Sequence, residues 1–228
     1  MKITTATCAL ALSLLASTAG AQVAPSAAEA AAYTGLHAAA HQGDVDKVVQ
    51  LSASGSALNA TDGNGRTPVH VAAFARQREV VRALAKAGAD LNLLDHDRYD
   101  AVTIAAVADD EATLAVLLQL GASAKQVTSR YDGTALIAAA HLGHDGVVRQ
   151  LIAAGAPLDH VNNLNWTAMI ESIVLGDGGP RHQATLKALL DAGASTQLAD
   201  RAGHTPLTLA KARGYSAMVE MLKQAGAR

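Results

Sequence analysis

Residues 65–92 read GRTPVHVAAFARQREVVRALAKAGADLN, and this stretch decides the fold. A polar opening at Thr67 leads into an apolar run, and a second apolar run ends before Gly88. Val81 and Leu84 are three residues apart, which places both on one face of a helix. Gly88 suits a left-handed helix C-cap. The stretch therefore predicts two short helices joined by a turn.

The same pattern returns along the chain at a nearly constant interval. A polar residue that opens an apolar segment recurs after steps of 33, 33, 34, 33 and 38 residues, at Thr34, Thr67, Asp100, Thr134, Thr167 and Thr205. A Gly followed by a small residue comes 21 residues after the opening in five repeats and 26 residues after it in the fifth. The chain is thus predicted to hold six units, with a five-residue insertion in the fifth.

These residues resemble the ankyrin repeat. The resemblance rests on the joint pattern TP-x-H, the recurring leucines and G-A-D-x-N, and it is closest at residues 65–92 and 203–227. It covers nearly all of the chain from about Thr34 onward. It implies an all-α solenoid of about six helix–turn–helix units with hairpin-like finger loops. One helix pair cannot bury its own apolar face, so the units must stack to form a continuous core.

Composition supports a packed, alanine-rich protein. Hydrophobic residues make up 50% of the chain and charged residues 17%, which excludes disorder. Aromatic residues are only 3%, so the core must consist mainly of Ala, Leu and Val. The formal net charge is -2 and no run of Lys or Arg forms a basic stripe. A nucleic-acid partner is therefore not expected.

The N-terminus has the pattern of a secretory signal peptide. Lys2 precedes an apolar stretch at residues 9–16, and Ala19-Gly20-Ala21 offers a cleavage site. We expect a signal peptide over residues 1–21, a lead-in over 22–33 and the repeat domain over 34–228. The apolar stretch is too short to span a membrane. Cys8, the only cysteine, lies in this segment without a lipoprotein motif. The chain is expected to be periplasmic or secreted, and monomeric.

No catalytic motif is evident. The glycine-rich run at residues 176–180 lacks the Gly-Lys-Ser/Thr ending of a phosphate-binding loop, and no strand is predicted before it. It is interpreted as the loop that holds the insertion, between the two helices of the fifth repeat. The role of the segment Gly176–His182 is left open, and it is the alternative interface if the fingers do not bind. The protein is expected not to be an enzyme and to need no cofactor.

Histidine pairs raise the question of a metal site. His37 and His41 are four residues apart, and His141 and His144 are three apart, so either pair could place two ligands together. No cluster supplies three ligands, and no metal is expected. The resemblance implies instead that His37 and His70 hydrogen-bond to brace the turns, and that His144 is structural.

Glu171 is an outlier, because other repeats have an apolar residue at its position. A buried carboxylate is costly unless it is hydrogen-bonded. One interpretation is that Glu171 accepts hydrogen bonds from the adjacent finger. The other is that it is a functional acid with a shifted pKa.

The fingers offer the main functional signal. The resemblance implies that the residue before each opening position points towards partners, at Arg66, Tyr99, Gly133, Trp166 and His204. Trp, Tyr and Arg dominate protein interfaces. The candidate protein-binding residues are Arg66, His96, Tyr99, Tyr131, Leu164, Trp166 and His204. Trp166 could also stiffen the neighbouring finger, which is compatible with binding.

The sequence therefore predicts a scaffold that binds and modulates a protein through its fingers and concave face. Secreted bacterial proteins that resemble this chain include some associated with stress-defence enzymes such as catalase, and some proposed as immunity proteins against toxins. The alternative is a small-ligand receptor or an enzyme with a pocket around Glu171. The identity of the partner does not follow from the sequence.

Overall fold

The computed structural model describes residues 22–228, in which every regular element is a helix. The predicted signal peptide at residues 1–21 lies outside this range. The helices are α1 (Ala27–Ala32), α2 (Gly35–Gln42), α3 (Val45–Ala53), α4 (Pro68–Phe74), α5 (Arg78–Lys86), α6 (Ala101–Val107), α7 (Glu111–Gln119), α8 (Ala135–Leu142), α9 (Asp145–Ala153), α10 (Ala168–Val174), α11 (Pro180–Asp191), α12 (Pro206–Ala212) and α13 (Ser216–Gln224). The predicted all-α solenoid is confirmed.

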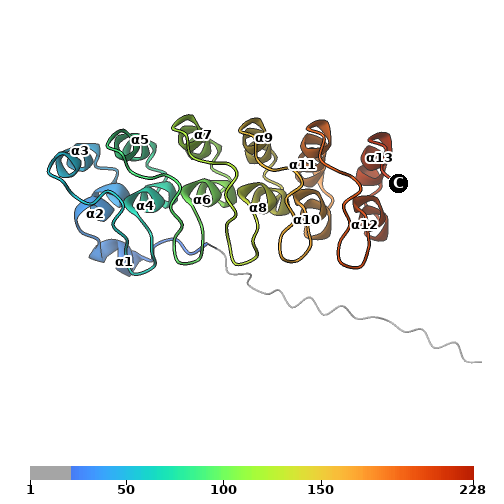
Figure 1. The fold of residues 1–228 in the computed structure, drawn as a ribbon, viewed down its shortest axis with the longest axis horizontal. Coiled ribbons are helices and arrows are strands. Elements are labelled where there is room, and N and C mark those ends of the chain that lie inside the picture. The colour runs from blue at the N-terminus through green and yellow to red at the C-terminus, as the bar shows by residue number, and fades with distance from the viewer. Residues whose placement is uncertain (1–21) are drawn as a thin grey trace, which may run out of the picture.

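The helices form two parallel rows in an elongated stack (Figure 1). The inner row contains α2, α4, α6, α8, α10 and α12, and the outer row contains α3, α5, α7, α9, α11 and α13. Within each row a helix packs against the next one, and each inner helix packs against the outer helix that follows it. The fingers project below the inner row, which gives the stack one edge made of loops (Figure 1).

Each inner helix begins directly after the first residue of the repeated segment. Thr67, Thr134, Thr167 and Thr205 cap their helices by accepting a hydrogen bond from the backbone N–H three residues on. Asp100 does the same, because its carboxylate accepts from the Thr103 N–H at 2.7 Å. The third repeat thus departs from the Thr-Pro pattern while it keeps the cap.

Histidine side chains join the inner helices α2 and α4 to the next finger, as the resemblance implies. The His70 Nδ1 lies 2.8 Å from the Thr67 hydroxyl, and its Nε2 lies 3.0 Å from the Tyr99 carbonyl oxygen. His37 Nε2 contacts the Arg66 carbonyl oxygen at 2.8 Å in the same way. Each contact spans 29 residues, so it fixes one repeat to the next.

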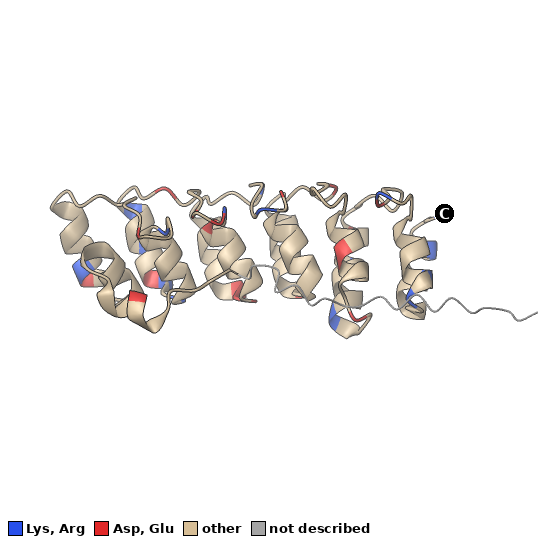
Figure 2. Cartoon of the chain, turned by 90° about the horizontal axis from the view of Figure 1, so that it is seen from below, with Lys and Arg blue, Asp and Glu red and all other residues tan. Residues whose placement is uncertain are grey.

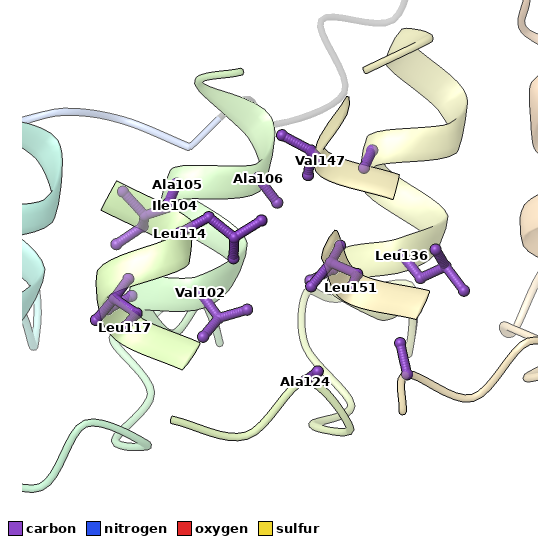
Figure 3. Packing of buried hydrophobic residues seen from close by; sticks show 14 of the residues in the cluster. Val102, Ile104, Ala105, Ala106, Leu114, Leu117, Ala124, Leu136, Val147 and Leu151 are labelled. Carbon is purple, nitrogen blue, oxygen red and sulfur yellow. The ribbon is translucent and has the colours of Figure 1, made fainter. Parts of the chain in front are cut away.

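The core runs without interruption through the stack. Figure 3 shows Leu114 and Leu117 of α7 beside Val102 of α6, with Leu136 and Leu151 of the next repeat facing them. All five side chains are at most 1% exposed. Small residues on the inner helices, such as Ala105 and Ala139, allow this close approach.

The insertion in the fifth repeat is only partly a loop, which corrects the sequence interpretation. Helix α11 has 12 residues, whereas the outer helices of the other repeats have nine, so part of the insertion extends a helix. Pro180 occupies the first helical position, where no backbone N–H is needed. Arg181 then reaches Asp109 of the third repeat at 2.7 Å, and the Tyr215 hydroxyl donates to the Gly176 carbonyl at 2.8 Å. The insertion therefore ties together repeats three, five and six.

Candidate functional site: the finger edge

The fingers are tight turns with a shared hydrogen-bond pattern. In the fourth finger the Asn162 N–H donates to the Trp166 carbonyl at 3.0 Å, and Asn162 Oδ1 accepts from the N–H groups of Leu164 and Trp166, both at 3.0 Å. Asn165 adopts the left-handed backbone that the turn requires, with a φ of 66°. A backbone hydrogen bond from the first residue's N–H to the last residue's carbonyl likewise closes the first, second, third and fifth fingers, at residues 62–66, 95–99, 128–133 and 200–204.

Neighbouring fingers are hydrogen-bonded to one another, so they form one continuous edge. The backbone bonds between fingers run from His96 N to Asn64 O (3.0 Å), from Ser129 N to Arg98 O (2.9 Å) and from Asn163 N to Tyr131 O (2.9 Å). Fingers two and three also exchange two ion pairs, Arg98 with Asp132 at 2.9 Å and Arg130 with Asp97 at 3.4 Å. Side chains on this edge are therefore held at fixed spacings.

The structure brings most of the predicted binding residues to this edge. Tyr99, Tyr131 and Trp166 are half-buried, each with part of its surface open to solvent. His96 and His204 are exposed, and Leu164 is 39% exposed. These six residues come from fingers two to five, so they are spread along the edge rather than gathered at one point.

Arg66 does not belong to the exposed edge, which corrects the sequence prediction. Its side chain is only 2% exposed. The guanidinium donates to Asp62 at 2.8 Å, to Glu29 at 2.6 Å and to the Val23 carbonyl at 3.2 Å. The lead-in segment supplies two of these three partners and covers the first finger. Repeat register alone could not reveal this contact, because the lead-in lies outside the repeats.

Sequence reasoning missed three further residues on the edge. Leu94, Val127 and Val161 directly precede fingers two, three and four, and they are 37%, 38% and 41% exposed. An aliphatic residue recurs at this position outside the predicted helices in three consecutive repeats, and this recurrence was a usable signal for an apolar surface. We define the apolar finger row by the aliphatic and aromatic residues of these three fingers together with the residue before each, namely Leu94, Tyr99, Val127, Tyr131, Val161, Leu164 and Trp166.

Glu171 lies beside this edge at the first turn of α10 and is only 6% exposed. Its Oε1 accepts a 2.8 Å hydrogen bond from the Asn162 amide, as the first interpretation of this residue predicted. Burial raises the pKa of Glu171 to about 7 despite this hydrogen bond. His141 Nδ1 lies 3.7 Å from the other carboxylate oxygen, and burial together with His182 lowers the pKa of His141.

Two hollows on the described surface are not lined by Glu171. One, of about 540 Å³, lies between α9 and α11 and is lined by Ile152, Lys187 and Ala188 among others. Another, of about 200 Å³, lies between the lead-in and the first two fingers. Over residues 22–228, no three His, Cys, Asp or Glu side chains are grouped to hold a metal ion. Within the same range, no helix is long and apolar enough to cross a membrane.

Paired short helices with hydrogen-bonded fingers define a repeat protein of the solenoid class. The family model for ankyrin repeats (three copies) matches residues 11–95, 36–128 and 102–200, so the chain belongs to the ankyrin-repeat family.

Known proteins are similar to this chain in sequence or in fold. The ankyrin repeat protein YahD of Escherichia coli is 40% identical over 100 residues, which are 43% of this chain and 50% of YahD; the chain thus matches about half the length of that relative. An ankyrin repeat domain from Acinetobacter baumannii AYE is 40% identical, with a TM-score of 0.80 over 85% of this chain and 98% of that one. A chain from the complex of the Bdellovibrio bacteriovorus endopeptidase Bd0816 with immunity protein Bd3460 is 24% identical, with a TM-score of 0.69 over 84% and 98%, and shows the fold alone.

Proposed function

We propose that this protein is a periplasmic scaffold that binds and modulates a partner protein through the apolar finger row and the concave face beside it. The observation that carries this proposal is the row itself. Seven aliphatic or aromatic side chains lie partly exposed on three consecutive, hydrogen-bonded fingers. A surface of this kind, which includes two Tyr and one Trp, has the composition of a protein interface.

The surroundings of the row fit the same role. His96, Arg98 and Arg130 are exposed around its apolar residues, which supplies a polar rim. Figure 2 shows Lys and Arg interspersed with Asp and Glu along the stack, with no continuous basic stripe on the face seen. Phosphate binding needs clustered cations, so this surface favours a protein over a nucleic acid.

The rival function, a receptor or enzyme built on Glu171, has less support. Proteins of this family are in general non-enzymatic scaffolds. Neither of the two hollows described above is lined by Glu171. Its carboxylate already has a structural partner in Asn162. A raised pKa in such a residue follows from burial and does not by itself require catalysis.

The periplasmic location rests on residues 1–21, whose sequence has the signal-peptide pattern. The chain beyond residue 21 has no cysteine, so an oxidising compartment places no demand on its fold. Stress-defence enzymes and toxins are the partner classes that we propose to test first.

A pull-down from periplasmic extract tests the function. The chain from residue 22 onward is the bait, with a Trp166→Ala variant and a Val49→Ala variant beside it. Val49 is 56% exposed on the outer helix α3, so it is a matched apolar control away from the fingers. We expect one protein to co-purify stoichiometrically with the wild type and with Val49→Ala, and much less with Trp166→Ala. A bound metabolite or metal without a protein would support the rival function instead.

A further inference from the structure

The first finger carries a polar site that the chain's own N-terminal segment fills. Residues 23–33, here called the strap, contain the short helix α1 and lie below α2, beside the first finger at the end of the stack (Figure 1). Ser26 caps α1 and forms a reciprocal pair of hydrogen bonds with Glu29. This capping box fixes the Glu29 side chain at the start of the helix, facing the finger.

Glu29 makes the principal contact of the strap with the repeats. Its Oε1 accepts hydrogen bonds from Arg66 Nη2 at 2.6 Å and from Asn64 Nδ2 at 2.5 Å. Hydrogen bonds from Ser26 and then from Arg66 lower the pKa of Glu29 to about 2, so it is ionised at neutral pH. The Val23 carbonyl oxygen accepts a further bond from Arg66 Nη1 at 3.2 Å. The strap thus presents a carboxylate and a backbone carbonyl to one guanidinium.

Arg66 is also held by contacts within its own finger, where its partner Asp62 accepts a further hydrogen bond from the Tyr33 hydroxyl of the strap at 2.7 Å. Its Nε donates to Asp62 Oδ2 at 2.8 Å, and Asp62 Oδ1 accepts from the Arg66 backbone N–H at 2.9 Å within the same finger. His37 also contacts the Arg66 carbonyl oxygen at 2.8 Å. Displacement of residues 23–32 therefore leaves the guanidinium oriented, with Nη1 and Nη2 free to donate to new partners.

Tyr33 anchors the end of the strap, because its ring packs against the core beside His37 and His41, but residues 23–32 are held mainly by polar contacts. Helix α1 has six residues and none of them is buried. The Val23 side chain is 67% exposed, and the Glu29 side chain is 37% exposed. Segments with few buried apolar contacts open locally at low free energy. Isolated helices of this length are also unstable in water, so α1 depends on these contacts.

We propose that Arg66 and Asn64 form a carboxylate-binding site on the first finger, which Glu29 occupies in cis and which a glutamate of a partner protein occupies when it displaces the strap. This inference rests on the proposed protein-binding function and adds a second contact point to the apolar finger row.

The surroundings of the site define the partner segment that fits. Asp95 and Asp97 of the second finger line the adjoining hollow together with Arg66 and Asn64. These carboxylates repel a run of acidic residues, because like charges at close range are unfavourable. The strap has one glutamate among alanines, Ser-Ala-Ala-Glu-Ala-Ala-Ala over residues 26–32. A matching partner segment therefore has a single glutamate in the first turn of a small-residue helix.

A peptide titration tests this site without any partner protein. The probe is QVAPSAAEAAAY, the sequence of residues 22–33, and a second peptide has glutamine in place of its glutamate. Each is titrated into the chain from residue 22 onward, as wild type and as Glu29→Gln, while the NMR resonance of the Arg66 Nε–H is followed. Glu79→Gln is the matched control, because Glu79 lies on α5 with its side chain 74% exposed and away from the strap.

We expect the glutamate peptide to shift the Arg66 resonance and to bind Glu29→Gln with an affinity about tenfold higher than it binds the wild type or Glu79→Gln. In the latter two proteins the tethered Glu29 competes at a high effective concentration. The glutamine peptide should leave the resonance unmoved. Equal binding of the two peptides, or no shift in Glu29→Gln, would overturn the proposal.

Hydrogen exchange supplies a second readout in the wild type. Amides of α1 should exchange faster than those of α2. Exchange of α1 only together with α2 would identify the strap as a fixed part of the fold and contradict its displacement. Neither measurement involves the apolar finger row, so failure of this proposal is distinguishable from failure of the proposed function.

Discussion

Asn162 donates a 2.8 Å hydrogen bond to Glu171, and this bond joins the fourth finger to helix α10. His141 lies 3.7 Å from the same carboxylate but adds little as an ion pair. Burial raises the pKa of Glu171 to about 7 and lowers the pKa of His141, so at any pH at least one of the two is mostly neutral. The amide therefore does most to hold this buried acid, and the acid should titrate near neutrality.

This titration predicts a pH-dependent stability. The pKa of Glu171 rises from 4.5 to about 7 on folding, so the folded chain binds the proton more tightly than the unfolded chain. The free energy of unfolding should thus fall as pH rises from about 4.5 to 7, and the loss should level off above that range, at about 3 kcal/mol in total. Glu171→Gln should remove this loss while its amide oxygen still accepts from Asn162.

The comparison is made by urea denaturation of both proteins at several pH values. The difference in the free energy of unfolding between the two proteins isolates the contribution of Glu171, because other titrating groups such as Asp100 are common to both. If this difference in unfolding free energy does not change between pH 4.5 and 7.5, Glu171 is not the group that makes the stability pH-dependent.

The core register predicts the effect of two leucine substitutions. Leu117 and Leu151 occupy the same position in consecutive repeats, and both are fully buried. Changing either to Ala should lower the free energy of unfolding by roughly 2–5 kcal/mol, since it removes buried apolar surface and leaves a cavity. Chemical denaturation measures this loss. A change of about 0.5 kcal/mol or less, as for a surface residue, would contradict the register.

The link between repeats predicts the effect of a histidine substitution. His70 is 2% exposed and bonds both to Thr67 and to the Tyr99 carbonyl of the next finger. His70→Ala removes the imidazole contacts of the buried Thr67 N–H and hydroxyl and of the Tyr99 carbonyl, so it should destabilise the chain by roughly 1–3 kcal/mol. Asn at this position retains a donor and should recover part of the loss. Equal unfolding midpoints for wild type and His70→Ala would exclude the bracing role.

Export is predicted from the N-terminal sequence. The chain isolated from its native host should begin at or near Gln22 and carry no lipid, because cleavage after Ala21 fits the small-residue rule. Intact-mass analysis of the isolated protein measures this. Retention of Met1 would exclude cleavage.

The repeats could be predicted from sequence because each unit repeats one physical requirement. A cap such as Thr67 must precede each inner helix, and residues such as Leu84 must fill the shared core. These demands recur at a fixed interval, so they are visible as periodicity. The finger bond of Glu171 was predictable for a related reason, since a buried carboxylate needs a donor.

Contacts outside the repeat pattern could not be predicted in this way. The burial of Arg66 depends on Glu29 and Val23, which belong to no repeat. The helical part of the insertion and the reach of Arg181 to Asp109 depend on packing between repeats three and five. Such contacts follow from tertiary geometry rather than from local periodicity.

The most direct test of the binding edge is the affinity of Trp166→Ala for the partner recovered by pull-down. Trp166 lies on the fourth finger, half-buried and outside the helices. Isothermal titration calorimetry should show that Trp166→Ala loses about 2 kcal/mol or more of binding free energy, on the scale of an interface hot spot. The unfolding midpoint of Trp166→Ala and the affinity of Val49→Ala should stay close to wild type. An unchanged affinity for Trp166→Ala would contradict the proposal that the apolar finger row is the interface.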